Sequence, residues 1–231
     1  MKKIVTSLIL AILTYAAVAQ NPATLTFLGI PVDGTRAEMV QALKAKGFRY
    51  NPYTGALMGK FNGVDSRIFI STNHGKVDRV YVCDANPSDK KQIRIRYNNL
   101  LQQFMDNTDK YFAIDDYTPI PDKEDIAREM RVHKKEYVAT FHLSPIYGWT
   151  DEEGSRFLDK LALEISDEIG EEKVPELTLE KKTELFVLKS IESFMKMTTG
   201  LVMFCIFKDS GKYYISLCYD NLNNHPIGED L

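Results

Sequence analysis

The sequence predicts an α+β protein in which an antiparallel sheet of about six strands packs against helices. Two patterns support this fold class. Short segments with apolar residues at every second position are separated by tight-turn residues, which is typical of antiparallel strands. Longer segments repeat apolar residues every three or four positions, which is typical of helices with one buried face. The order of these segments suggests two duplicated half-domains, 24–107 and 108–231.

The first half is expected to hold two helices and three strands. Thr35 and Glu38 have the spacing of a capping box, which predicts the start of a helix, and Gly47 predicts its end. Three antiparallel strands follow, at 56–61, 66–71 and 76–83. A long helix then runs from about 87 to 107, with an apolar stripe along one side.

The second half contains a helical insertion. We expect a strand or ordered loop at 111–117, a helix at 122–130, a strand at 134–143, helices at about 151–169 and 178–197, and a hairpin at 200–208 and 212–220. The two long helices make up the insertion, residues 145–198. The closing hairpin is apolar on both faces, and such strands are usually covered on both sides. The inserted helices are the expected second cover; without it, the exposed aromatic surface would mark a binding site.

The first nineteen residues predict a cleavable secretory signal peptide. The pair Lys2-Lys3 precedes a short apolar run, and residues 17–19 form a small-x-small cleavage signature. This run is shorter than the roughly 20 apolar residues that cross a bilayer, and no second run follows it. We therefore expect cleavage near Ala19-Gln20 and a single mature domain, residues 20–231. The mature protein would be secreted or periplasmic and have no membrane anchor.

Composition argues against one class of partner. The chain carries a net charge of −3, which becomes −5 when Lys2 and Lys3 are removed with the signal peptide. Nucleic-acid binding needs clustered cations, so we expect no nucleic-acid partner. The hydrophobic content of 44% is enough for a core that does not depend on disulfides.

An odd number of cysteines in an exported chain leaves at least one thiol unpaired. The three cysteines are Cys83, Cys205 and Cys218. A two-residue turn at 210–211 would place Cys205 opposite Ser216, and Met203 opposite Cys218. The two cysteines of the hairpin would then be diagonal neighbours roughly 7–8 Å apart, which is too far for a relaxed disulfide. We expect free thiols, whereas a bulge in the turn would shift the register and favour a disulfide.

No residue pattern predicts catalysis, a cofactor or a metal site. The histidines lack metal-ligand spacing, and we expect each to be solvated or singly hydrogen-bonded: His74, His133, His142 and His225. The adjacent Asp115 and Asp116 would point to opposite faces of an extended segment, so spacing alone does not make them an acid–base pair. A hydrolase would require Asp115, Asp116, Asp220 or His142 to converge in a cleft.

The insertion carries the features best suited to recognise a partner. Residues 151–180 hold eleven acids and three bases, a net charge of −8, which is usually a solvated helix face but could attract a basic partner. Tyr147 and Trp149 lie in an aromatic loop before the first inserted helix. Trp149 could anchor a ligand there or tuck under the helix pair. Four cations at 90–96 begin the preceding long helix, where acids are preferred, and this suggests an ion-pair partner such as the acidic insertion.

Both ends of the mature chain resemble a group of known proteins. Residues 27–35 read Phe-Leu-Gly-Ile-Pro-Val-Asp-Gly-Thr, and residues 219–223 read Tyr-Asp-Asn-Leu-Asn. These are similar to the opening Phe-x-Gly-Ile-Pro-x-Asp-Gly-Thr and, more loosely, to the closing Tyr-x-Asp-x-x-Asn of uncharacterised small secreted proteins of Bacteroidetes bacteria. The helical insertion departs from the compact members of that group. Because the group has no known activity, the resemblance implies an exported location and a fold, and no chemistry.

These observations together predict an exported, non-catalytic binding or interaction protein. Its partner would be a protein or a peptide, and Tyr147 and Trp149 would belong to the recognition surface. Two alternatives remain: the hydrolase described above, and a structural subunit of an envelope assembly. An apolar patch left exposed on the terminal hairpin would favour the assembly subunit.

Overall fold

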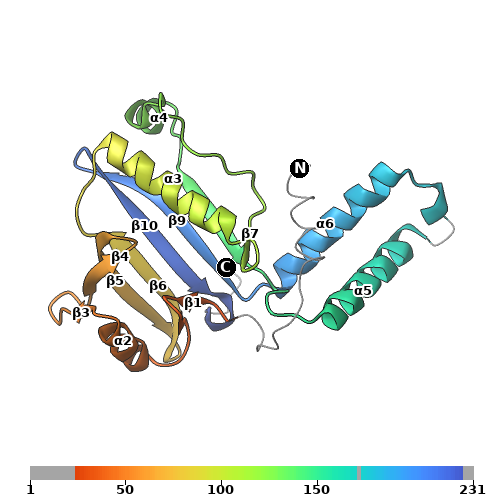
Figure 1. Cartoon of the computed structure of the whole chain (residues 1–231), viewed down its shortest axis with the longest axis horizontal. Coiled ribbons are helices and arrows are strands. Elements are labelled where there is room, and N and C mark those ends of the chain that lie inside the picture. Colours follow the sequence, from red (N-terminus) through yellow and green to blue (C-terminus); the bar gives the residue numbers. More distant parts are fainter. Residues whose placement is uncertain (1–23, 171–172, 226–231) are drawn as a thin grey trace, which may run out of the picture.

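A computed structural model describes residues 24–170 and 173–225 of the 231-residue chain. The predicted signal peptide, residues 1–19, lies outside these ranges, as do the cleavage site and the residues after His225. The described residues form a mixed α+β fold (Figure 1). None of their helices is both long enough and apolar enough to cross a bilayer.

Eight antiparallel strands form the central sheet, in the order β3-β4-β5-β6-β10-β9-β8-β7. They are β3 (Arg49–Tyr50), β4 (Leu57–Phe61), β5 (Val64–Asn73), β6 (Lys76–Asp84), β7 (Tyr111–Phe112), β8 (Val138–Leu143), β9 (Gly200–Asp209) and β10 (Lys212–Asn221). A separate small sheet pairs β1 (Thr26–Phe27) with β2 (Ile30–Pro31). The expected number of about six strands was too low. The edge strands β3 and β7 have two residues each, which is too short to show alternation.

Five helices are described: α2 (Arg36–Ala45), α3 (Lys90–Asp106), α4 (Ile126–Val132), α5 (Asp151–Ile169) and α6 (Leu179–Met197). The predicted capping box at the start of α2 is confirmed. The Thr35 hydroxyl accepts a hydrogen bond from Glu38 N at 3.3 Å, and the Glu38 carboxylate accepts one from Thr35 N at 2.8 Å. Helix α4 begins four residues later than expected because Asp125 caps it, accepting from Ala127 N at 3.1 Å.

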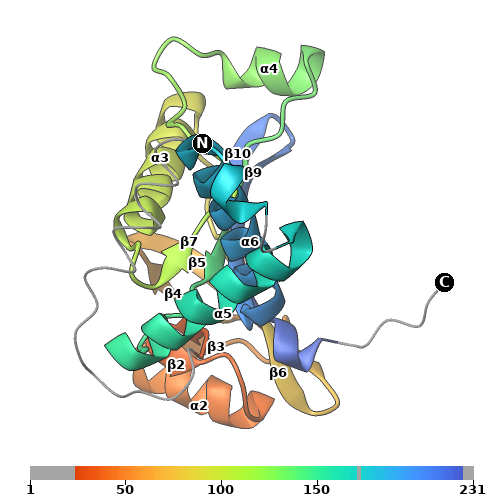
Figure 2. The same ribbon diagram turned by 90° about the vertical axis from the view of Figure 1, so that its right-hand side faces the viewer.

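The core lies on the face of the sheet that α2 and α3 cover (Figures 1 and 2). The stripe predicted on the long helix is buried, with Ile93 and Leu101 fully enclosed. Phe104 of α3 stacks on Phe141 and Phe204 of the sheet, with ring centroids 5.0 and 5.7 Å away. Burial of these large side chains is the main contribution to the stability of the fold.

A buried ion pair fixes α3 to the centre of the sheet. Asp84 at the end of β6 is 1% exposed, and both of its oxygens accept from Arg96 Nε of α3 at 2.9 Å. One of them also accepts from Ile215 N of β10 at 3.1 Å. A buried carboxylate needs such partners because desolvation alone would strongly disfavour its charge.

The two halves of the chain meet at the pairing of β6 with β10. The register predicted for the terminal hairpin is confirmed, since Cys205 lies opposite Ser216 and Met203 opposite Cys218. Ser216 also lies opposite Cys83 on its other side. All three thiols are free, as expected. Burial raises the pKa of Cys205, and it raises that of Cys218 to about 12, so both thiols stay protonated at neutral pH.

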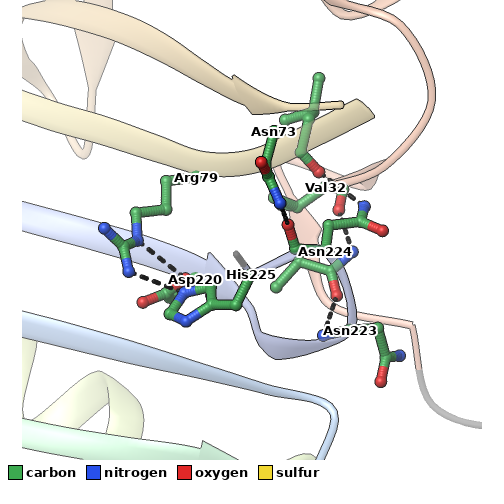
Figure 3. A network of polar contacts seen from close by, with 9 residues as sticks. Val32, Asn73, Arg79, Asp220, Asn223, Asn224 and His225 are labelled. Carbon is green, nitrogen blue, oxygen red and sulfur yellow. Dashed lines mark hydrogen bonds and ion pairs between the residues drawn. The ribbon is translucent and has the colours of Figure 1, made fainter. Parts of the chain in front are cut away.

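The segments that carry the resemblance, one at each end of the described chain, hold each other in place (Figure 3). Asn221 Nδ2 donates to Val32 O at 2.6 Å. Asn224 Nδ2 lies 2.9 Å from Asp33 Oδ1 and 2.8 Å from Val77 O, and Asn224 O accepts from Asn73 Nδ2 at 2.9 Å. We call this set of contacts the terminal clasp. It gives both motifs a structural role: they close the small β1–β2 region against the end of β10.

No described helix covers the opposite face of the sheet, and here one expectation was wrong. The inserted helices α5 and α6 extend away from the sheet and do not cover the second face of the terminal hairpin (Figure 1). Met203 of β9 is 41% exposed and Phe69 of β5 is 37% exposed on that face. The reason is that α5 and α6 bury their apolar sides against each other and against Phe112 in the edge strand β7.

Candidate interaction surface

We call residues 150–198 the helical arm. The arm connects β8 to β9, which are neighbours in the sheet, so both of its ends lie at adjacent strand ends. Thr198 fixes this junction, because its buried hydroxyl lies 2.8 Å from Leu143 O and 3.1 Å from Gly200 O. The arm is therefore an insertion between two paired strands, and Figure 1 shows it projecting beyond the rest of the molecule.

A row of aromatic rings joins the arm to the sheet. Phe194 of α6 is 1% exposed and contacts Phe112 of β7 and Phe157 of α5, with centroids 5.6 and 5.5 Å away. Beyond Phe112 the row continues to His142 of β8 at 5.3 Å. Its other end is Trp149, whose ring meets Phe157 edge-on at 5.6 Å. Each aromatic contact of this kind adds about 0.5–1.5 kcal/mol to the burial of the rings.

The two binding residues predicted from sequence both lie at the base of the arm. Trp149 is half-buried and tucks against the first turns of α5, which was one of the two positions expected for it. Tyr147 is also half-buried and packs against the main core. Trp149 thus contacts the arm itself, whereas Tyr147 contacts the core beside it, and both residues remain partly exposed.

The arm has the features of a self-contained helical hairpin. Thr150 and Glu153 form a second capping box at the start of α5, and Thr178 caps α6 through a 3.3 Å bond from Lys181 N. Leu161 is buried between the helices, and Lys189 of α6 forms an ion pair with Glu168 of α5. These contacts orient the two helices against each other without using the main core.

The outer surface of the arm is apolar in places and acidic overall. Leu188 is 56% exposed and Met195 is 38% exposed; they are seven residues apart on α6, so they share one side of that helix. Leu163 of α5 is 64% exposed among charged residues. Asp159, Asp167 and Glu176 are exposed and form no ion pair among the contacts of the described residues. The acids of the arm are evident in the sequence, and the spacing of Leu188 and Met195 is the signal from which the apolar side of α6 could have been predicted.

The cations that begin α3 do not pair with the acidic arm, contrary to expectation. Lys90 Nζ lies 2.8 Å from Asp125 Oδ1, and Arg94 donates to Asp122 O at 2.6 Å. Arg96 pairs with the buried Asp84. These cations tie α3 to the segment before α4 and to β6, and none of them forms an ion pair with a described residue of the arm.

Among the contacts of the described residues, Asp115, Asp220 and His142 of the hydrolase alternative share no hydrogen bond with one another. Asp220 pairs with Arg79, Nε to Oδ1 at 3.1 Å, and with His225 (Figure 3). His142 lies two strands away from Asp220, roughly 10 Å across the sheet. Asp115 and Asp116 are exposed in the segment after β7, where Asp115 accepts from the Tyr117 hydroxyl at 3.2 Å. Among the described residues, no cluster of His, Cys, Asp or Glu is suited to hold a metal ion.

His142 was expected to be solvated or singly hydrogen-bonded, and instead it is buried. It is 8% exposed, stacks on Phe112, and its Nδ1 has no hydrogen-bond partner among the described residues. Burial lowers the pKa of His142, an effect that the nearby Asp115 partly opposes. This histidine is therefore neutral at pH 7, and its ring packs against Phe112 as part of the aromatic row at the base of the arm.

Comparisons with known proteins give no further assignment, because no protein-family model, curated protein or solved structure matches the chain.

Proposed function

We propose that the chain is an exported, non-catalytic binding protein that recognises another protein through its helical arm. The observation that carries this proposal is the exposure of Leu188 and Met195 on an acidic helical hairpin that covers no core. Apolar side chains gathered on one side of a helix and surrounded by charges are typical of a docking surface. The proposal that the protein is exported rests on the predicted signal peptide.

The charge of the arm defines the kind of partner. The exposed carboxylates at Asp159, Asp167 and Glu176 favour a partner with a basic rim around an apolar groove. In this proposal Trp149 and Tyr147 fix the direction of the arm and contribute their exposed ring edges at its base.

The test is quantitative capture of proteins from the exported fraction of the source organism on immobilised mature protein. The arm variant carries Leu188→Gln and Met195→Gln. The control variant carries Ile95→Gln and Val132→Gln on α3 and α4, where the side chains are 48% and 55% exposed. We expect the arm variant alone to lose a partner by at least tenfold, and that partner, once purified, to bind the wild type less tightly at high salt. Equal recovery on both variants would refute the proposal, provided that circular dichroism shows both to be folded.

The open face of the sheet favours a second candidate, a subunit of an envelope assembly. Met203 and Phe69 are its most exposed apolar residues, and Phe207 stacks on Tyr214 with centroids 5.1 Å apart. Met203, Phe207 and Tyr214 lie on the terminal hairpin, where an exposed apolar patch was expected to favour the assembly subunit, and Phe69 extends this surface to β5. Sedimentation velocity distinguishes the two candidates, because assembly through this face would be abolished by Met203→Glu and unaffected by the arm variant.

A further inference from the structure

A pocket lies at the edge of the sheet farthest from the arm. Its volume is about 600 Å³, within the range of ligand sites. One wall is the chain that leaves α2, residues 46–49, and the other wall is β4 with the start of β5. Because β3 and β4 are the first strands of the sheet order and β8 and β7 the last, the pocket and the arm occupy opposite ends of the sheet.

Three cations and one acid line this pocket. Lys46, Arg49 and Lys60 are all exposed, and none forms an ion pair among the described contacts. The acid is Asp65, which lies opposite Lys60 across β4 and β5. Elsewhere several cations are paired, such as Lys90 with Asp125 and Lys135 with Glu124. The pocket therefore has two more positive than negative side chains, and no ion pair among the described residues neutralises this excess.

The pocket also contains a free strand edge. β3 pairs with β4 only at Met58 and Leu57, so residues 59–61 have a strand neighbour on the β5 side alone. The preceding chain turns away there, because Phe48 N donates to Leu43 O at 3.1 Å. The Phe48 ring packs directly over Gly59, where a Cβ would lie 2.4 Å from Phe48 Cδ1. This packing fills the space over Gly59 on one face of β4, and the pocket lies beside it, between residues 46–49 and the strand.

We propose that this pocket binds an extended acidic peptide segment as an added strand on β4. An edge strand offers unpaired backbone N–H and C=O groups to such a peptide. The peptide would continue the line of β3 beyond Phe48, antiparallel to β4, with its main chain bonded to residues 60–61. Its carboxylates would face Lys46, Arg49 and Lys60. Opposite charges across the site would attract the peptide and fix which of its residues lies opposite each residue of β4. This inference is independent of the role proposed for the arm.

The experiment is a titration of the ¹⁵N-labelled mature protein with the blocked peptide Ac-Glu-Thr-Glu-Thr-Glu-Thr-Glu-NH₂, followed by amide NMR spectra. We expect saturable shifts at Gly59, Lys60 and Phe61. Arg49→Glu with Lys60→Glu should weaken binding at least tenfold. The matched control, Lys123→Glu with Lys134→Glu, changes two exposed cations outside the pocket and should bind like the wild type. The analogous lysine peptide, Ac-Lys-Thr-Lys-Thr-Lys-Thr-Lys-NH₂, should not bind.

Each other outcome would overturn the proposal. If citrate or inorganic phosphate produced the same shifts with the same affinity, the pocket would be a site for small anions. If the peptide shifted amides on other elements, or bound the pocket variant and the wild type equally, the added strand would be refuted. Absence of any shift at millimolar peptide would refute it as well.

Discussion

The packing of Phe48 over Gly59 can be tested by adding one methyl group. In Gly59→Ala the new Cβ would lie 2.4, 2.7 and 3.0 Å from Phe48 Cδ1, Cε1 and Cγ. The ring is 5% exposed and cannot swing into solvent without uncovering core, so ring and strand must move apart. Overpacking of this kind costs about 1–3 kcal/mol, and the reduced entropy of the unfolded chain returns about 0.4–1 kcal/mol.

We therefore expect Gly59→Ala to destabilise the fold by about 1–2 kcal/mol, from the difference between these two effects. For a chain of this size, that corresponds to a fall in Tm of about 2–8 °C. Urea unfolding followed by circular dichroism measures the free energy of unfolding. The control is Gly154→Ala in α5, where the new Cβ meets nothing within 4 Å and stability should be unchanged or higher.

A double-mutant cycle completes this test. Phe48→Leu should remove much of the additional cost of Gly59→Ala, because the smaller side chain leaves room for the methyl group. If Gly59→Ala were as stable as the wild type, or if its cost were the same with Leu at position 48, the close approach of ring and strand would be refuted.

Three further predictions concern buried groups. Asp84→Asn should lower the free energy of unfolding by about 3–5 kcal/mol because Arg96 would stay buried without its counter-ion; a loss below about 1 kcal/mol in urea titrations would contradict the buried pair. Stability should fall as the pH is lowered from 7 to 5, since burial lowers the pKa of His142 and the unfolded chain takes up a proton that the folded chain resists. In His142→Gln that part of the pH dependence should disappear, and an unchanged profile would assign it to other groups. Finally, iodoacetamide added to denatured protein without a reductant should label three thiols, as read from the intact mass; a single label would indicate a disulfide.

Much of the fold could be predicted because its signals are local. Alternating apolar residues identified β4, β5, β6, β8, β9 and β10, and the capping residues at Thr35 and Glu38 located α2. The register of the terminal hairpin followed from its two-residue turn. The edge strand β3 was not predicted, because two residues are too short to show alternation. The edge strand β7 begins the segment 111–117, which was expected to be a strand or an ordered loop.

The candidate surfaces were harder to predict, since they depend on where elements attach. Sequence placed Trp149 and the acidic helices together, yet their attachment to the edge strand through Phe112 and Phe194 is a tertiary contact. The cations of the edge pocket come from two segments, Lys46 with Arg49 and Lys60, and neither segment alone forms a basic cluster. The contacts of the terminal clasp were not predicted either, because Asn221 of the second motif and the neighbouring Asn224 reach Val32 and Asp33, which are distant in sequence.

The position of β10 has a consequence for how the chain folds. This strand lies in the middle of the sheet but comes last among the strands in sequence, and its neighbours are β6 and β9. A chain that emerges from its N-terminus would hold two incomplete half-sheets, each with an unpaired inner edge, until residues 212–221 appear. The clasp contacts at Val32 and Asp33 also await Asn221 and Asn224. Folding should therefore finish in one late step that forms long-range contacts, and such contacts form slowly. Until that step, a chaperone could bind the unpaired strand edges of the incomplete chain.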